Sequence, residues 1–430
     1  MTIAQDLMTL IDASPVNFMA AQYVEQSLQK TGFKELKAED AFPAFKPGDQ
    51  FYVTKNGTAV FAFRIGKRPM EEAGFKLICA HSDSPGFRIK PQAEIKCEGK
   101  LVKLNTEVYG GPILYTWFDR PLSVAGRVMT RSNNPLHPTV RRMKTDRPIL
   151  IIPHLAIHFN RSVNDGNPLS KQRDMLPVLG FINNELEAGN MLLNIISQTL
   201  GCPTDEILDF DLSLYDTQPA TQVGMNSEFI SSGRLDDLAM VHAGLHALTH
   251  TATTDMTQVL AIFDNEETGS GTKQGAASPV LRNIIERICN QRPTPDAFYR
   301  AIEHSFMISA DMAHALHPNY TDKHDPTNHP LMGGGPVIKI NANQKYVTDA
   351  DSAAVFAEIC KKAGVPCQYF VNHSDSAGGS TLGNILTSQM PMRGVDMGNP
   401  MWAMHSVRET ICTADQEYTC KAFTEFYNTD

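Results

Sequence analysis

Apolar residues recur every three or four positions between residues 3 and 30, and the pattern is interrupted near Ser14-Pro15. This spacing predicts two helices, because it gathers the apolar side chains on one face of each helix. Residues 50–65 show strand-like alternation, and the run Leu77–Ala80 is wholly apolar. Alternation and short apolar runs are both typical of β-strands, so the chain is expected to begin with helices and continue with strands.

The pattern of apolar and polar positions changes between about residues 91 and 229, where short β-like segments such as 101–109, 122–129 and 149–159 are separated by turns. After Gly233, strand-like and helical segments alternate to the end of the chain, as in a parallel sheet covered by helices. We therefore predict an α/β domain with a mixed, mostly parallel sheet between helices. It would be formed by residues 1–90 and 230–430 and interrupted by a β-rich domain at residues 91–229.

The 430 residues include 38 Lys and Arg and 47 Asp and Glu, which gives a net charge of −9. This balance disfavours a nucleic-acid-binding protein, which usually has a basic face. No run of about 18 uncharged apolar residues is present, so no membrane span is expected. The eight cysteines are scattered without a C-x-x-C pair, and the N-terminus has no signal-peptide pattern. We therefore expect reduced thiols in a cytoplasmic protein.

Three apolar, strand-like runs are each followed within a few positions by imidazole or carboxylate groups. The runs are residues 77–80, 259–263 and 306–308. Because the carboxyl ends of parallel strands share one edge of a sheet, the groups that follow them are expected to converge. These groups are His81, Asp83, Glu266, Glu267 and Asp311.

Two further segments place charged groups on loops that lead into predicted helices, Asp236-Asp237 before residues 238–248 and His405 before residues 407–412. The combined set can hold two zinc ions if one carboxylate bridges them. Each group alone has an ordinary explanation, such as a hydrogen-bonded histidine, a solvated turn or a helix cap. Their occurrence at three strand ends favours a metal hydrolase.

The motifs around these residues resemble those of the aspartyl aminopeptidases. In chain order they are Ala80-His81-Ser82-Asp83-Ser84-Pro85, Ser232-Gly233-Arg234-Leu235-Asp236-Asp237, Asp264-Asn265-Glu266-Glu267, Asp311-Met312-Ala313-His314-Ala315 and Ala403-Met404-His405-Ser406. The similarity continues through Tyr109-Gly110-Gly111, Trp117-Phe118-Asp119-Arg120 and residues 152–158, so it spans most of the chain. Members of this family are zinc metallopeptidases that remove acidic residues from peptide N-termini.

The resemblance implies a zinc-aminopeptidase-like fold with an inserted oligomerisation domain, and a site with two zinc ions. Asp236 would bridge the ions, His81 and Asp311 would complete one, and Glu267 and His405 the other. Asp83 would hold the imidazole of His81 in its working tautomer, and Glu266 would be the general base. Manganese or cobalt could replace zinc at an oxygen-rich site of this kind.

Three residues are expected to contact the substrate, and the resemblance points to two of them, Lys339 and His158. Lys339 alone would be interpreted as an edge-strand lysine facing water, but it matches the family lysine that pairs with the acidic side chain of the substrate. His314 follows Asp311 by three residues and is expected to point into the same cleft. His154 and His158 would share one face of a strand at 149–159, as surface or interface histidines. The family position that matches His158 reaches into the active site of a neighbouring subunit.

That position implies a homo-oligomer, which is a dodecamer in this family, and the implied substrates are peptides with N-terminal Asp or Glu. Two alternatives remain open. One is a dizinc aminopeptidase or amide hydrolase of broader specificity, which the role of Lys339 would distinguish. The other is a catalytically silent peptide-binding scaffold, which would be expected to lack Glu266 or a metal ligand.

Two other patterns are predicted to be structural. His242, His246 and His250 are spaced four residues apart on a predicted helix, but no acidic partner accompanies them as in H-E-x-x-H. They are expected to form an ordinary helix face. Gly333-Gly334-Gly335 is followed by a strand and not by Lys-Ser/Thr, so it predicts a flexible turn and not a phosphate-binding loop.

Overall fold

The computed structural model describes residues 1–182, 191–291 and 294–430. The chain folds into two compact units. The first unit contains residues 1–83, 220–404 and 409–430, and the second contains residues 84–219 and 405–408. The α/β fold with a mixed, mostly parallel sheet and separate antiparallel strands confirms the predicted fold class.

The first unit is built on a nine-stranded sheet. Five of its eight neighbouring pairs are parallel. The strands in spatial order are β1 (Lys34–Glu35), β2 (Gln50–Lys55), β3 (Ala59–Arg64), β13 (Thr257–Phe263), β4 (Phe75–His81), β14 (Phe306–Ala310), β18 (Arg393–Gly398), β16 (Val337–Ile340) and β17 (Gln368–Val371). A five-stranded sheet in the same unit has the order β11 (Thr221–Val223), β12 (Phe229–Ser232), β20 (Glu409–Cys412), β19 (Pro400–Trp402) and β15 (Ala313–His314).

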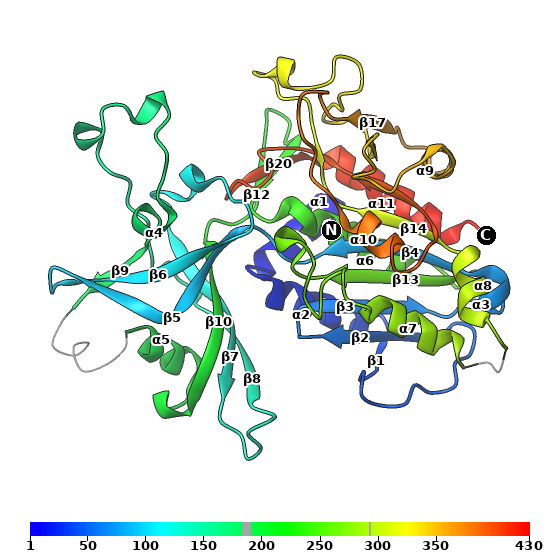
Figure 1. Ribbon diagram of the computed structural model, residues 1–430, viewed down its shortest axis with the longest axis horizontal. Helices are drawn as coiled ribbons and strands as arrows, with labels where there is room; N and C mark the ends of the chain where they lie inside the picture. The colour runs from blue at the N-terminus through cyan, green and yellow to red at the C-terminus, as the bar shows by residue number, and fades with distance from the viewer. Residues whose placement is uncertain (183–190, 292–293) are drawn as a thin grey trace. The chain divides into compact units, whose positions relative to one another are not determined.

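Helices cover both faces of the nine-stranded sheet (Figure 1). Successive side chains of a strand point to opposite faces, so in β4 Ile78 and Ala80 join one core while Leu77 and Cys79 join the other. The first core includes side chains of α1 (Ile3–Ala13), α2 (Asn17–Lys30), α6 (Leu235–His250), α9 (Ala350–Lys362) and α11 (Thr413–Asn428). The second includes those of α3 (Met70–Ala73), α7 (Val280–Cys289), α8 (Ala297–Glu303) and α10 (Leu382–Thr387).

The predicted N-terminal helices are confirmed, and they separate where Ser14 and Pro15 interrupt the pattern. The first helix begins with a capping box. The hydroxyl of Thr2 accepts a hydrogen bond from the backbone N–H of Gln5, and the side chain of Gln5 accepts one from the N–H of Thr2. These bonds satisfy two backbone donors that the first turn of a helix leaves open. The sequence thus fixes where this helix begins.

The second unit is a six-stranded antiparallel sheet with its own core. Side chains of α5, including Leu192 and Ile196, pack with Val124, Leu212 and their neighbours on the strands. The strands in spatial order are β8 (Thr139–Lys144), β7 (Leu122–Thr130), β10 (Ile207–Asp216), β5 (Gly86–Cys97), β6 (Leu101–Tyr109) and β9 (Val178–Phe181). The helices are α4 (Lys171–Asp174) and α5 (Met191–Leu200).

Two sequence-based predictions of secondary structure are wrong. Residues 149–159 do not form a strand, because only Leu150 and Ile151 make isolated bridges, and Ile157–Phe159 is a 3-10 turn. Pro153 interrupts the segment and has no N–H to donate to a neighbouring strand. The segment after His405 leads into the strand β20 rather than into a helix, and α11 begins only at Thr413.

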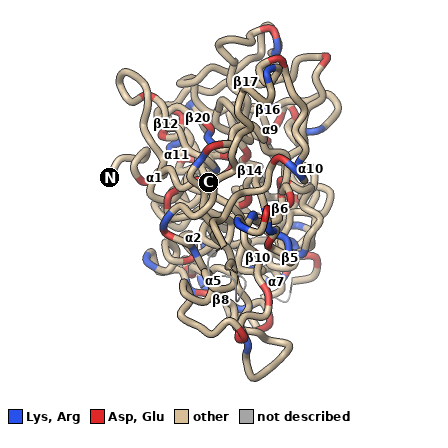
Figure 2. The backbone as a smooth tube through the Cα atoms, turned by 90° about the vertical axis from the view of Figure 1, so that its left-hand side faces the viewer, with Lys and Arg blue, Asp and Glu red and all other residues tan. Residues whose placement is uncertain are grey.

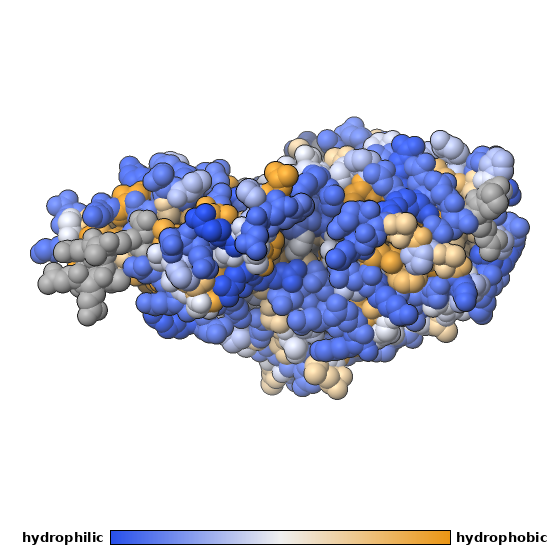
Figure 3. Space-filling model, turned by 90° about the horizontal axis from the view of Figure 1, so that it is seen from below, coloured by the Kyte–Doolittle hydropathy of each residue, from blue (hydrophilic) through white to orange (hydrophobic). Residues whose placement is uncertain are grey.

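The surface carries both signs of charge and scattered apolar groups. Figure 2 shows Lys and Arg interspersed with Asp and Glu along the chain. In the second unit Arg88 and Arg127 both form ion pairs with Asp211. The face drawn in Figure 3 is largely hydrophilic, with apolar side chains in small groups. None of the helices in the described residues has the length and apolar character needed to cross a membrane.

Candidate metal centre

The three strands that were expected to carry the site lie side by side. β4 is between β13 and β14 and pairs with both in parallel, and Phe263 is level with His81 while Ser309 is level with Cys79. Because the strands run in the same direction, their carboxyl ends meet at one edge of the sheet. The predicted convergence of the groups that follow these strands in the first unit is confirmed.

His81 ends β4 and is almost completely buried, with 1% of its side chain exposed. Its Nδ1 lies 3.1 Å from the backbone oxygen of Asp83 and 3.4 Å from Oδ1 of the same residue. Its Nε2 lies 3.4 Å from Oδ1 of Asp236. A hydrogen bond donated by Nδ1 leaves the lone pair of Nε2 directed toward Asp236, which is the tautomer that a metal ligand requires.

The carboxylate of Asp83 holds the turn that carries Glu266 and Glu267. Oδ1 of Asp83 accepts the backbone N–H of Glu266 at 3.1 Å, and Oδ2 accepts that of Glu267 at 3.2 Å. The turn follows β13 and forms the 3-10 helix Glu266–Thr268, preceded by Asn265 in the left-handed region. Asp83 therefore orders both the imidazole of His81 and the two glutamates, and the second of these contacts was not foreseen from the sequence.

Asp236 and Asp237 occupy the start of α6 and depart from helical backbone angles, so the regular helix begins at Leu238. The backbone N–H of Asp236 donates to Oε2 of Glu409, a buried side chain of β20, at 3.0 Å. Oδ2 of Asp237 accepts the backbone N–H of His81 at 3.1 Å. From the sequence, Asp237 was among the candidate charged groups without a role of its own, and Glu409 was not among them. The acidic pair at a helix start was a usable signal for Asp237, whereas nothing in the sequence marks Glu409.

The ligand atoms in the first unit lie close enough to share metal ions. His81, Asp236, Asp237 and Asp311 each offer one within 4.8 Å of the others, as do His81, Glu266 and Glu267 in a second group. Asp236 and Glu267 also offer oxygens within 4.8 Å of each other. One imidazole with several carboxylates is a donor set that suits zinc.

The electrostatics of the cluster also fit cations. Burial, with further contributions from nearby carboxylates, raises the pKa of Glu266 to about 8 and the pKa of Glu267 to about 11. Burial opposes the charged form of His81, but the neighbouring carboxylates, Asp237 foremost, raise its pKa well above the usual value. Carboxylates crowded in this way retain protons unless cations neutralise them. The residues present therefore fit a metal centre.

Lys339 contacts Asp311 of this cluster, and His314 follows Asp311 by three residues in β15. Lys339 is 2% exposed and interior to the sheet, because β17 lies beyond β16. Its ammonium donates to the backbone oxygens of Asp311 at 2.8 Å and Met312 at 3.2 Å, and lies 3.7 Å from Oδ2 of Asp311. The edge-strand interpretation that the pattern alone suggested is wrong. His314 is exposed, and its ring centroid lies 5.8 Å from that of Phe370.

His405 and His158 belong to the second unit. The Nδ1 of His405 lies 3.1 Å from the backbone oxygen of Gly111, which leaves its Nε2 as the nitrogen with a lone pair. His158 is exposed in the turn Ile157–Phe159. His154 does not share a strand face with it, because residues 149–159 form no strand, and the ring of His154 packs on Phe118 at a centroid distance of 4.5 Å.

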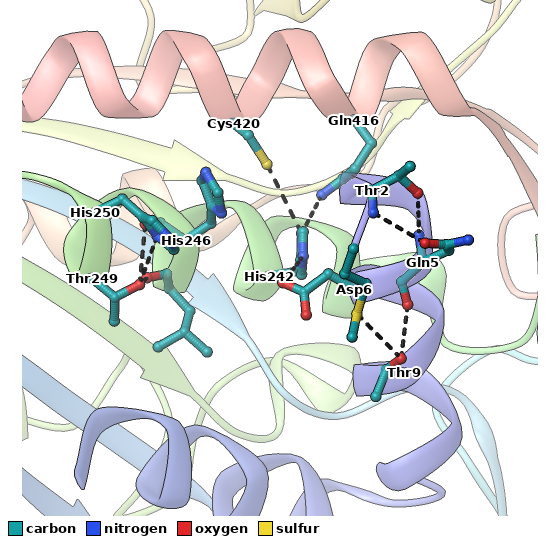
Figure 4. A network of polar contacts seen from close by, with 12 residues as sticks. Thr2, Gln5, Asp6, Thr9, His242, His246, Thr249, His250, Gln416 and Cys420 are labelled. Atoms are coloured by element: carbon teal, nitrogen blue, oxygen red, sulfur yellow. Dashed lines mark hydrogen bonds and ion pairs between the residues drawn. The ribbon is translucent and has the colours of Figure 1, made fainter. Parts of the chain in front are cut away.

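The histidine row of α6 has a structural role that does not involve the metal centre (Figure 4). Nε2 of His242 lies 3.2 Å from Oδ2 of Asp6 in α1, and Nδ1 accepts from the side-chain amide of Gln416 in α11 at 3.0 Å. The rings of His246 and His250 stack with centroids 4.2 Å apart. Burial and the two neighbouring imidazoles lower the pKa of His246 to about 4. No group of candidate metal ligands in the described residues includes these histidines.

Comparison with known proteins identifies similar chains over the full length. Residues 10–427 match the family model of the aminopeptidase I zinc metalloproteases (M18). The chain is 49% identical to a probable M18 family aminopeptidase 2 of Clostridium novyi, over 99% of this chain and 98% of that protein. It is 43% identical to a probable M18 family aminopeptidase 2 of Pseudomonas aeruginosa, over 98% and 97% of the two chains.

Solved structures agree with these sequence matches. The cryo-EM structure of a complex of Ape4 and Nbr1 contains a chain with a TM-score of 0.95 and 35% identity, over 99% of this chain and 85% of that chain. The structure of the S. cerevisiae mApe1 dodecamer gives a TM-score of 0.87 at 25% identity, over 99% and 96% of the two chains.

Proposed function

The chain belongs to the M18 family of zinc aminopeptidases, and we propose that it removes N-terminal Asp or Glu from unblocked peptides with two metal ions per subunit. The observation that carries this proposal is the cluster of buried His81 and Asp236 with partly buried Asp311, Glu266 and Glu267. In the proposed site Asp236 would serve both ions, His81 and Asp311 would complete one, and Glu267 and His405 would complete the other. Zinc is the proposed metal at both positions, with manganese or cobalt as substitutes at one of them.

Two bound cations would supply Lewis acidity toward the scissile carbonyl and activate a water molecule for attack. The residues of this chain supply the remaining steps. Glu266 accepts a proton from the attacking water and delivers it to the leaving amine. Asp83 keeps Glu266 in place through the hydrogen bond to its backbone N–H, and it fixes the orientation of His81. His314, on the exposed strand end after Asp311, is the proposed contact to the peptide.

The preference for acidic substrates is assigned to Lys339. Its ammonium is buried 3.7 Å from Oδ2 of Asp311, so a positive charge lies beside a proposed metal ligand. A buried cation attracts an acidic side chain, and a neutral substrate would gain nothing from the same charge. The ion pair with Asp311 already compensates part of that charge, and this observation favours broader specificity as the second candidate function.

Lys339→Met tests the assignment. We expect the ratio of kcat/KM for acidic over neutral aminoacyl chromogenic substrates to fall at least ~10-fold, since a hydrogen bond to a charged group is lost. Metal content is measured in parallel because Lys339 also contacts the loop of Asp311. Lys345→Met removes an exposed lysine nearby and serves as the control. An unchanged ratio in Lys339→Met would favour the enzyme of broader specificity.

We include in the proposal that the protein forms a homo-oligomer, a dodecamer, through its β-rich unit. A similar protein, mApe1, is described as a dodecamer. In the second unit the segment around His158 exposes apolar side chains that a partner could cover, with Leu155 55%, Ile157 52% and Phe159 80% exposed. All eight cysteines of the chain are free thiols, which is consistent with the proposed cytoplasmic location.

In this assembly His158 would enter the site of a neighbouring subunit and donate a hydrogen bond to the substrate or the oxyanion. We therefore expect His158→Ala to lower turnover of acidic substrates at least ~10-fold without loss of metal, because such donors act in the transition state. His137→Ala changes another exposed histidine of the same unit and should be neutral. Full specific activity in isolated, metal-loaded subunits would refute the proposal that His158 completes the site of a neighbouring subunit.

A further inference from the structure

The turn at Gly333–Gly335 is tightly confined, although the sequence suggested a flexible one. Gly333 and Gly335 adopt positive φ angles of 82° and 86°, which favour glycine. A Cβ on Gly334 would lie 2.4 Å from the side-chain amide of Gln368, and one on Gly335 would lie 2.2 Å from the backbone oxygen of Pro366. The turn is followed by Pro336 and then directly by β16, which carries Lys339.

The carboxylate of Asp415, in the first turn of α11, binds this turn from one side. Oδ2 accepts the backbone N–H of Gly333 at 2.8 Å, and Oδ1 accepts that of Gly335 at 2.8 Å. Asp415 is completely buried. Each oxygen of one carboxylate is therefore used to fix one backbone amide of the turn.

The side chain of Gln368 binds the same turn from the other side. Its Oε1 accepts the N–H of Leu331 at 2.8 Å, and its Nε2 donates to the backbone oxygens of Leu331 at 2.9 Å and Gly335 at 3.2 Å. The backbone N–H of Gln368 donates to the oxygen of Pro336 at 2.9 Å. Four contacts from one residue of β17 thus fix both ends of the turn.

The side chains of Asp415 and Gln368 together form a clamp on the turn, and burial within this clamp disfavours the ionised form of Asp415. Burial raises the pKa of Asp415 to about 6, although the two N–H donors oppose this shift. Between about pH 4 and 6 the folded protein therefore holds this proton more firmly than the unfolded chain, so the contribution of Asp415 to stability declines as the pH rises through that window. At neutral pH the ionised carboxylate therefore costs some stability, while both of its oxygens accept backbone N–H groups of the turn.

We propose that Asp415 and Gln368 are positioning residues for substrate preference. They fix the turn at the start of β16, and β16 places Lys339 beside the loop of Asp311. β16 has only four residues. It pairs with β18 through Val337 and Ile338, and with β17, the strand that begins at Gln368, along its whole length, so the turn and the strand that Asp415 and Gln368 hold together set the place of Lys339. The clamp binds Gly335, four residues before Lys339. This inference rests on the proposed role of Lys339 in recognising acidic substrates.

The test is a double-mutant cycle on the full-length, metal-loaded enzyme with Asp415→Asn, Lys339→Met and the combination. Asparagine keeps the shape but turns an NH2 group toward one of the two backbone donors. We expect Asp415→Asn to lower the acidic-over-neutral ratio of kcat/KM roughly 10-fold, through KM for the acidic substrate, with metal content unchanged. In the Lys339→Met background the same change should have no further effect on the ratio, because the clamp acts through Lys339.

A second readout does not depend on activity. Hydrogen exchange of the amides of Gly333 and Gly335 should accelerate in Asp415→Asn, while the amides of β14 stay protected. Gln368→Met, which keeps the length and removes the amide, should act in the same direction and covers the case in which Asp415→Asn fails to fold. Glu425→Gln, on the same helix, is the matched control.

The outcomes separate this inference from the proposed function. If Lys339→Met lowers the ratio but Asp415→Asn and Gln368→Met do not, the positioning role is refuted and the role of Lys339 stands. If the Asp415 effect is equally large in the Lys339→Met background, the clamp does not act through Lys339 and the inference also fails. An unchanged ratio in Lys339→Met overturns both.

Discussion

Replacing Glu266 with Gln is expected to reduce peptide hydrolysis by at least ~10²-fold while the metal content stays the same. The substitution keeps the shape of the side chain and removes only the carboxylate that accepts the proton. The backbone of Glu266 would remain bound to Asp83, because its N–H donates to Oδ1 of that residue at 3.1 Å. Steady-state kinetics and metal analysis of the same preparation measure the two quantities.

Glu267→Gln provides the matched comparison, since the two glutamates are adjacent and both are held by Asp83. Glu267 is a proposed ligand, so its replacement should lower metal content, whereas replacement of Glu266 should not. Activity near that of the wild type in Glu266→Gln would show that another group accepts the proton. Loss of metal in Glu266→Gln would instead make it a ligand.

Asp236→Ala is expected to lose metal and activity together. In the proposed site one carboxylate would serve both ions, so its removal would take a ligand from each and remove the anion shared by two dications roughly 3.5–4 Å apart. The backbone N–H of Asp236 would still be held by Glu409, so the start of α6 should keep its place. Metal analysis after dialysis and circular dichroism of the same sample separate loss of metal from loss of fold.

Asp237→Asn is the neighbouring control. Oδ2 of Asp237 accepts the N–H of His81, and the oxygen of an asparagine can accept the same bond, so metal content should fall less than in Asp236→Ala. Two ions per chain in Asp236→Ala would contradict the bridging role. Equal loss of metal in both variants would assign Asp237 to the ligand set as well.

The strands that carry the first-unit site were predictable from the sequence because buried parallel strands are short runs of apolar residues. β4, β13 and β14 are short apolar runs, each followed by groups that can bind metal ions. Parallel neighbours place these groups at one edge of a sheet, so their convergence followed from direction alone. The prediction for residues 149–159 failed because Pro153 interrupts the segment and only isolated bridges form there.

Only the tertiary structure showed which segments far apart in the sequence contact each other. The sequence pattern around Lys339 is typical of an edge strand. In the folded chain β17 pairs with the outer side of β16, so Lys339 lies in an interior strand. Glu409 supports Asp236 from 173 positions away, and Asp415 fixes Gly333 from 82 positions away. Periodicity reports only how a residue relates to its neighbours along a helix or strand. Which buried carboxylate meets which backbone amide depends on how these elements pack, and it becomes visible only when the chain is folded.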